Sequence, residues 1–423
     1  MKEEENNNNQ VFALGCRLNA FEAELIKEQA KKAGVSNTIF VNSCTVTSEA
    51  HKQSMQLVRK LKRENPNANI VVTGCGAEID PNSFANMKEV SKVIGNKDKF
   101  SLNALKSEEK IILGDLNSEE DFTIPQIQGF ENRTRAFIQI QQGCDHRCTF
   151  CIIATARGKS KSLPQDTIIQ QIKQAVDFGH KEVVLTGVDI SSWNRDALVN
   201  SPSRIGFLCK EILKEVPNLP RLRLSSLDPA VVDSDILDLL KHESRFMPHI
   251  HLSLQAMNNS VLKNMGRRHS RENAIAWIND LRTANKNVAI GADMICGFPR
   301  ETDEQFEDTY STIKDLKIPF LHVFPYSTRK NTIAEKMKEI PMDIRKKRAK
   351  ILSGLAEQIK VDFFKAKLNT VEEVLCESNN MGYTKDYSLV KILGNAPQKE
   401  IINVEIVDYN QRQLIAKVVD NGK

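Results

Sequence analysis

The cysteines of residues 143–151, GCDHRCTFC, are the side chains whose spacing most directly predicts chemistry. Cys144, Cys148 and Cys151 form a C-x3-C-x2-C array. Clustered thiolates are soft ligands that suit zinc or an iron–sulfur cluster. Structural zinc usually takes four ligands, and the nearest further candidate, His146, lies between two of the cysteines, too close to both for a tetrahedral arrangement. A cubane cluster held by three cysteines keeps one iron open, and we expect a substrate or cofactor to fill that position.

Three further cysteines each follow the C-terminal end of a predicted strand. These are Cys16 after residues 11–14, Cys44 after residues 38–42 and Cys75 after residues 69–74. Parallel strands place their C-terminal ends at one edge of a sheet, where α/β folds build their sites. A lone cysteine of this kind is more often a small buried apolar residue. Three at equivalent positions predict a second metal site, whereas Cys209, Cys296 and Cys376 match no ligand pattern and are expected to serve packing.

The elements that must position these cysteines alternate between strand and helix patterns. Residues 11–101 predict an α/β domain with an open parallel sheet. Residues 102–132 are polar and irregular and are interpreted as a linker. Residues 133–366 contain about six strand–helix units, which predict a partial (β/α)6 barrel with its site at the strand C-terminal ends. Residues 367–423 show short period-2 strands typical of a small antiparallel β-barrel.

Composition favours a soluble protein of the cytoplasm. The chain has 423 residues, a net charge of +5 and nine cysteines. Clustered cysteines in a reducing compartment more often bind metal than form disulfides. No apolar run approaches the roughly 18 residues that a membrane helix needs. Residues 1–10 have no secretory pattern and are expected to be a disordered tail.

Residues at the ends of other predicted barrel strands are candidates for cofactor contacts. They are Gly187, Ser226 and Gln255, and ordinary strand-end turns are the alternative. Gly187 would allow close approach of a backbone. Arg267 and Arg268 are candidates to bind a carboxylate or a phosphate, and a solvated basic turn is the alternative.

The cysteine array, with Phe150 before its last cysteine and a position after the first barrel strand, resembles the radical S-adenosylmethionine enzymes. With LGCRLN, NSCTVT and TGCGAE upstream and a small β domain downstream, the resemblance extends over nearly the whole chain to the methylthiotransferase family. Within it, LGCRLNAFEAELI, QQGCDHRCTFCII and LTGVDISSW are similar to threonylcarbamoyladenosine tRNA methylthiotransferases. This chain departs from the common pattern at Ala154, where relatives commonly carry proline.

The resemblance implies two 4Fe–4S clusters and S-adenosylmethionine as cofactors. Cys144, Cys148 and Cys151 would hold the cluster that generates a radical, and Cys16, Cys44 and Cys75 would hold an auxiliary cluster that carries the sulfur. The product would be a methylthio group on C2 of N6-threonylcarbamoyladenosine beside the tRNA anticodon. A radical fits this reaction because no side-chain base deprotonates an aryl carbon at neutral pH. Implied partners are the tRNA anticodon stem-loop, a one-electron donor such as flavodoxin or ferredoxin, and a sulfur source, with the enzyme a monomer.

The nucleic-acid side rests on weaker patterns. The basic run at residues 345–350 and the C-terminal β domain resemble the tRNA-gripping TRAM module of this family. Tyr383, Tyr387 and Tyr409 are candidates for stacking on bases. Most basic runs, however, are simply solvated helix faces.

Three other functions stay open at this point. The same chemistry could act on isopentenyladenosine in tRNA or on an aspartate of a ribosomal protein. A member of another class, a non-catalytic RNA-binding protein stabilised by zinc, would contain zinc and no iron. A pure electron carrier fits poorly, because carriers normally close every cluster position with cysteine.

Overall fold

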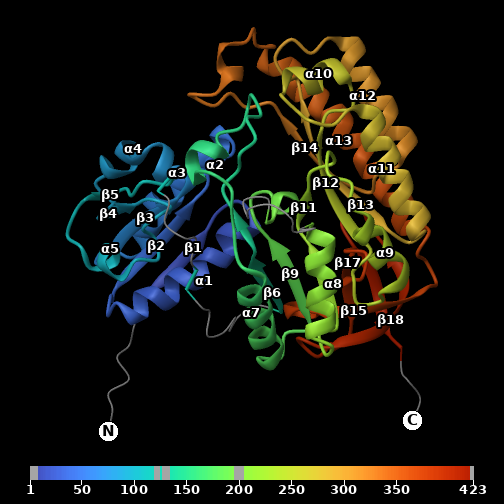
Figure 1. Ribbon diagram of the computed structural model, residues 1–423, viewed down its shortest axis with the longest axis horizontal. Helices are drawn as coiled ribbons and strands as arrows, with labels where there is room; N and C mark the ends of the chain where they lie inside the picture. Colours follow the sequence, from blue (N-terminus) through green and yellow to red (C-terminus); the bar gives the residue numbers. More distant parts are fainter. Residues whose placement is uncertain (1–7, 119–123, 126–133, 195–203, 420–423) are drawn as a thin grey trace.

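The computed structural model describes residues 8–118, 124–125, 134–194 and 204–419, which form three units (Figure 1). The predicted tail at 1–10 lies largely outside these residues, and the predicted linker at 102–132 lies outside them at 119–123 and 126–132. Where they are described, they differ from the prediction. Gln10 already belongs to the first strand, and residues 102–112 form a helix and a strand that complete the N-terminal sheet. No helix in the described part of the chain is long and apolar enough to cross a membrane.

The N-terminal unit is a five-stranded parallel sheet in the order β1-β2-β3-β4-β5, flanked by helices. Every residue of β2 is buried, as expected for a strand covered on both faces of a parallel sheet. Its elements are β1 (Gln10–Ala13), α1 (Arg17–Lys32), β2 (Thr38–Ser43), α2 (Ser48–Glu64), β3 (Asn69–Gly74), α3 (Cys75–Ile79), α4 (Pro81–Ala85), β4 (Lys92–Ile94), α5 (Leu102–Lys106) and β5 (Ile111–Ile112).

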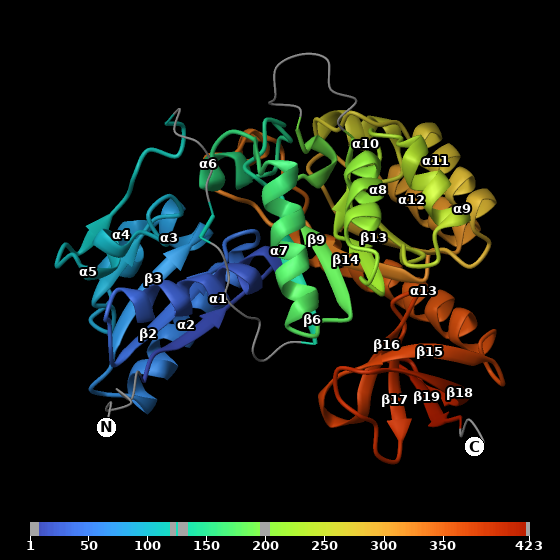
Figure 2. The same cartoon turned by 60° about the horizontal axis from the view of Figure 1, so that its bottom comes forward.

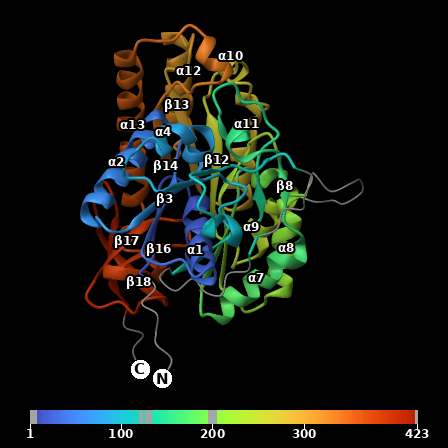
Figure 3. The ribbon, with the colours of Figure 1, turned by 90° about the vertical axis from the view of Figure 1, so that its left-hand side faces the viewer.

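Helix α1 joins this unit to the next one. Ile26 and Ala30 pack against the N-terminal sheet, whereas Leu18, Phe21 and Leu25 belong to the main hydrophobic core of the barrel. Because the helix buries two faces, it fixes the N-terminal sheet against the barrel. Figure 3, viewed from the side of the N-terminal unit, shows that unit in front of the barrel strands.

The central unit confirms the partial (β/α)6 barrel. Its parallel strands form two sheets, β10-β9-β6 and β11-β12-β13-β14, and Ser225 separates β10 from β11. The elements are β6 (Arg135–Gln139), β7 (Gln141–Gln142), α6 (Ile153–Arg157), β8 (Lys161–Ser162), α7 (Gln165–Asp177), β9 (Glu182–Thr186), η1 (Ile190–Ser192), α8 (Ile205–Glu215), β10 (Arg221–Leu224), β11 (Ser226–Leu227), α9 (Ser234–His242), β12 (His249–Gln255), α10 (Asn259–Asn264), α11 (Arg271–Ala284), β13 (Ala289–Cys296), α12 (Asp303–Leu316), β14 (Phe320–Pro325), η2 (Ile333–Lys336) and α13 (Met342–Lys365).

The C-terminal unit is a closed five-stranded barrel that follows α13 (Figure 2). Its strand order is β15-β16-β17-β19-β18. The pairs are antiparallel as predicted, except that β17 and β19 run parallel. The elements are β15 (Val371–Cys376), η3 (Ser378–Asn380), β16 (Met381–Thr384), β17 (Leu389–Leu393), β18 (Ile401–Tyr409) and β19 (Leu414–Val418).

All three units meet at Tyr387, in the loop between β16 and β17. Its hydroxyl accepts hydrogen bonds from Arg17 of α1 at 2.9 Å and from Arg135 of β6 at 3.1 Å. Its ring lies 4.8 Å from the ring of His249 on β12 and 4.8 Å from that of Tyr383. Tyr387 therefore contacts both other units, and the ion pairs Arg221–Glu373 and Arg135–Glu377 add further contacts between the barrel and the C-terminal unit.

Candidate iron–sulfur and cofactor site

The loop that carries the C-x3-C-x2-C array is closed at its base by the short antiparallel pair of β7 and β8. Gly143 begins this loop with a φ of +73°, and a Cβ atom there would lie 1.8 Å from the carbonyl oxygen of Lys159. Only glycine fits this turn. The backbone N–H of Cys144 then donates to the carbonyl of Gly158 at 3.1 Å, which fixes the first cysteine of the array.

The far side of the loop is held by the segment after α10. The backbone N–H of Thr149 donates to the carbonyl of Met265 at 2.9 Å, and its hydroxyl donates to that of Asn264 at 2.8 Å. Arg267 follows directly and places its guanidinium 3.5 Å from the sulfur of Cys148. The array is thus positioned from both ends, with a cation beside its middle cysteine.

The thiols of this array lie in surroundings that disfavour bare thiolates. Burial raises the pKa of Cys144 to about 12 and that of Cys151 to about 11. The neighbouring thiols make smaller contributions in the same direction. A bound metal centre would supply the positive charge that these sulfurs need as thiolates.

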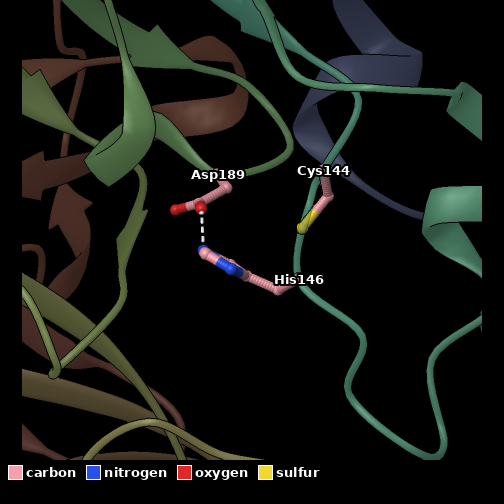
Figure 4. Close-up of side chains that lie close together, drawn as sticks. All are labelled: Cys144, His146 and Asp189. Atoms are coloured by element: carbon pink, nitrogen blue, oxygen red, sulfur yellow. Dashed lines mark ion pairs between the residues drawn. The ribbon is translucent and has the colours of Figure 1, made fainter. Parts of the chain in front are cut away.

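His146 is paired with a carboxylate. Its Nε2 lies 2.8 Å from Oδ2 of Asp189, which follows β9 (Figure 4). The same carboxylate oxygen accepts a hydrogen bond from Ser192 at 2.6 Å. The ligand atoms of Cys144, His146 and Asp189 lie within 4.8 Å of one another. His146 thus has a carboxylate partner within the protein. This agrees with the expectation that it is a loop residue and not a cluster ligand.

The second set of cysteines converges at the C-terminal edge of the N-terminal sheet. Cys16 precedes α1, Cys44 follows β2 and Cys75 begins α3. A Cβ atom on Gly15 would lie 2.5 Å from the sulfur of Cys44. Burial, with smaller contributions from the thiols of Cys16 and Cys75, raises the pKa of Cys44 to about 11. The three cysteines therefore lie near one another at this edge of the sheet, and their binding of one metal centre stays a prediction.

Arg157, at the end of α6, connects the barrel to this second site. Its Nε donates to the sulfur of Cys75 at 3.1 Å, and its Nη1 donates to Glu22 of α1 at 2.7 Å. Lys99 lies 2.5 Å from the same carboxylate. Although burial opposes ionisation, Arg157 and Lys99 lower the pKa of Glu22 to about 2. A buried network of three charged side chains therefore lies beside Cys75 of this site.

The two sets of cysteines lie close together. Arg157, six positions after Cys151, donates to the sulfur of Cys75 at 3.1 Å. The thiol of Cys75 also contributes to raising the pKa of Cys151 in the array and that of Cys16 in its own set. One cysteine of the second set therefore lies near the array.

The predicted cofactor contacts lie at strand ends, as expected, but Gly187 has another reason to be glycine. A Cβ atom there would lie 2.8 Å from the backbone oxygen of Gln141. Ser226 begins β11 and Gln255 ends β12, and both are half-buried. The close approach at Gly187 is to the chain itself, so its residue type alone gives no evidence of a bound cofactor.

Arg267 and Arg268 share one carboxylate. Asp228, after β11, accepts from Arg267 at 3.2 Å and from Arg268 at 2.8 Å. The buried Nε–H of Arg267 has no hydrogen-bond partner within the described residues. A buried guanidinium donor beside the cysteine array fits the carboxylate of an amino-acid cofactor. The interpretation of these arginines as a solvated basic turn is therefore wrong for Arg267, which is largely buried.

Two candidates for RNA contacts are already engaged in protein contacts. Tyr383 and Tyr387 stack on each other, and the guanidinium of Arg135 lies 4.5 Å from the ring centre of Tyr383. Both rings are half-buried and engaged in contacts between units, and their stacking on bases stays a prediction. Tyr409 is half-buried against the core of the C-terminal barrel.

Two of the five basic residues in the run on α13 are buried. Arg345 and Arg348 are buried and pair with Glu339 and Glu301, whereas the lysines of the run are exposed. The exposed lysines are Lys346, Lys347 and Lys350.

Sequence reasoning missed the network of Arg157, Glu22 and Lys99. Its members are far apart in the sequence, and each is of a charged residue type that is usually exposed to solvent. The three remaining cysteines, Cys209, Cys296 and Cys376, are buried as packing residues, as expected.

Comparisons with known proteins agree with this architecture. Residues 138–313 match the Radical SAM superfamily, and residues 9–95 match the uncharacterized protein family UPF0004. A threonylcarbamoyladenosine tRNA methylthiotransferase of Rickettsia prowazekii is 41% identical over 94% of this chain and 95% of its own length. One from Aquifex aeolicus is 34% identical, with coverage of 93% and 98%.

A solved structure shares the fold. The radical S-adenosylmethionine methyltransferase TsrM from Kitasatospora setae matches with a TM-score of 0.54 at 14% identity, over 76% of each chain. Its structure contains cobalamin and a 4Fe–4S cluster. The relatives, matched over nearly the whole chain, exclude the alternative of a non-catalytic zinc protein. The chain belongs to the radical S-adenosylmethionine methylthiotransferase family, whose members use S-adenosylmethionine and two 4Fe–4S clusters.

Proposed function

We propose that the protein is a tRNA methylthiotransferase that places a methylthio group on C2 of N6-threonylcarbamoyladenosine beside the anticodon. The observation that carries the proposal is the closeness of the two three-cysteine sites, where Arg157, six positions after Cys151, donates to the sulfur of Cys75 at 3.1 Å. Relatives named for this substrate, 30–41% identical over nearly the whole chain, support it.

We assign Cys144, Cys148 and Cys151 to the radical-generating cluster, and Cys16, Cys44 and Cys75 to the auxiliary cluster. Thiolates that bind three different irons stand further apart than the ligands of one ion. Consistent with this, neither set has its three sulfurs within 4.8 Å of one another in the described part of the chain. The donor sets fit two open cubanes better than two zinc ions.

When bound, the clusters and S-adenosylmethionine supply the one-electron chemistry that an unactivated C–H bond of adenine requires. Arg157 places a fixed positive charge against Cys75 and offsets the negative charge of its thiolate. Arg267 does the same beside Cys148, and its free Nε–H is available to a cofactor carboxylate. Gly187, Ser226 and Gln255 would line the cofactor site at the strand ends.

The tRNA would reach the site along the C-terminal unit and α13. Lys346, Lys347 and Lys350 leave one side of α13 free to contact phosphates. A one-electron donor and a source of sulfur complete the partners that the reaction requires.

The test is nucleoside analysis of tRNA from a strain that lacks the gene, followed by complementation. The expected result is loss of 2-methylthio-N6-threonylcarbamoyladenosine and gain of its unmethylthiolated precursor, with other methylthio nucleosides unchanged. Complementation by a Cys148→Ala variant should fail. Loss of the isopentenyladenosine derivative instead would move the proposal to that substrate, and unchanged tRNA would overturn it.

A further inference from the structure

Two histidines and an aspartate that belong to neither cysteine site meet on adjacent barrel strands. His251 lies on β12, Asp293 on β13 and His322 on β14, and their ligand atoms lie within 4.8 Å of one another. Nε2 of His251 and Nδ1 of His322 are each 3.2 Å from Oδ1 of Asp293. Both imidazoles therefore converge on the same carboxylate oxygen.

The strand register builds this cluster on the inner face of the sheet. Asp293 pairs with His322, and His251 pairs with Gly291. Side chains alternate along a strand, so Ala292 and Met294 point the other way and pack in the main hydrophobic core. The inner face then receives the polar side chains.

Gly291 leaves the room that the cluster needs. A Cβ atom there would lie 2.5 Å from Nδ1 of His251. Any larger residue would push the imidazole away from Asp293. The neighbouring strand thus provides a space for this ring.

The distances match those of ligands that share one ion. Imidazole and carboxylate ligands lie about 2.0–2.2 Å from a divalent transition metal, so ligands at right angles stand about 3 Å apart. The observed separations from Asp293 to both histidines are 3.2 Å. Two imidazoles and one carboxylate form a donor set that such metals accept with positions left open. We propose that His251, Asp293 and His322 bind a divalent transition-metal ion.

The open positions of this ion are accessible. The side chain of His322 is 60% exposed, and β14 is an edge strand of its sheet within the described residues. The threonylcarbamoyl group of the proposed substrate carries a carboxylate and a hydroxyl, which are oxygen ligands, whereas an isopentenyl group carries none. A role of the ion in holding that group rests on the proposed function, but metal binding itself does not.

The test measures zinc binding to the holoenzyme after anaerobic reconstitution, when the cluster cysteines are occupied. Equilibrium dialysis against zinc sulfate, with metals quantified by mass spectrometry, should give one zinc per chain. Asp293→Asn and His322→Ala should each lower the affinity tenfold or more. His242→Ala, an exposed histidine beside Asp238 on α9, should leave the affinity unchanged.

X-ray absorption at the zinc edge identifies the ligands. Nitrogen and oxygen neighbours at about 2.0–2.1 Å, and no sulfur near 2.3 Å, are expected. Sulfur neighbours, or equal zinc binding by the wild type and the His322→Ala variant, would overturn the inference. Because the side chain of His322 is exposed, His322→Ala should fold and keep its iron content. This variant therefore decides the result even if Asp293→Asn fails to fold.

The role in substrate binding has its own readout. At a zinc concentration that saturates the wild type but not the variant, His322→Ala should show a higher KM than the wild type for tRNA that carries the threonylcarbamoyl group. If no zinc binds while the wild type still methylthiolates that tRNA, the metal site fails and the proposed function stands. If zinc binds but that tRNA is not a substrate, the metal site stands and the proposed function fails.

Discussion

Glu22 should be the most costly single charge to remove from the N-terminal unit. Its side chain is fully buried and lies 2.7 Å from Arg157 and 2.5 Å from Lys99. Glu22→Gln leaves both cations buried without their counter-charge. Removing one partner of a buried ion pair costs about 3–5 kcal/mol.

The pKa of Glu22 gives a second route to the magnitude. The two cations overcome the effect of burial and lower this pKa from 4.5 to about 2. At 1.36 kcal/mol for each pKa unit, the shift corresponds to about 3 kcal/mol of stability at neutral pH. The two estimates agree.

The pH dependence follows from the direction of the shift. A carboxylate with a depressed pKa contributes fully above its unfolded pKa, near 4.5, and loses its contribution as the pH falls toward 2. The stability difference between the wild type and Glu22→Gln should therefore be largest at pH 7 and shrink steadily below pH 4.5.

Urea unfolding of the metal-free protein, followed by circular dichroism at pH 7 and at pH 3, measures this difference. Glu215→Gln is the matched control, because its exposed pair with Lys173 at 3.8 Å should contribute less than about 1 kcal/mol. A Glu22→Gln variant no less stable than the control, or a loss equal at both pH values, would refute the reasoning.

Three other perturbations test the remaining parts of the account. Replacing the three cysteines of the array by alanine should lower the iron content of the reconstituted protein from about eight to about four per chain, and a fall to zero would contradict a separate second cluster. Tyr387→Phe removes the acceptor of two arginine hydrogen bonds and should cost about 2–4 kcal/mol in urea unfolding; an unchanged midpoint would contradict the docking role. Lys346→Gln with Lys347→Gln should weaken tRNA binding and flatten its salt dependence by about one unit for each lost phosphate contact, whereas unchanged binding would remove α13 from the tRNA interface.

The sequence predicts the placement of the second cysteine set because that placement follows from topology. Cys16, Cys44 and Cys75 come together since parallel strands end at one sheet edge. The six barrel strands are likewise recognisable as separate apolar runs. No comparable rule relates Glu22 to Arg157, which lie 135 positions apart and meet only when the N-terminal unit packs against the barrel.

The prediction that the basic run contacts RNA fails for Arg345 and Arg348, because both are buried against acidic partners of the same unit. Arginine is usually exposed, so its residue type alone favours RNA contacts. Tyr383 and Tyr387 are half-buried in contacts between units, which no local sequence pattern indicates. The His251–Asp293–His322 cluster was missed because its members lie on three strands and form no local motif.

The contacts of Tyr387 fix the distance between the C-terminal unit and the cysteines. Because one phenol contacts the N-terminal unit, the barrel and the C-terminal unit together, the three units cannot swing apart without breaking its hydrogen bonds. If the C-terminal unit grips the tRNA, the span from the gripped surface to the cysteines is set before the tRNA arrives. The enzyme would then select the nucleotide that lies at this fixed distance from the gripped surface. Little binding energy would be lost in ordering the domains.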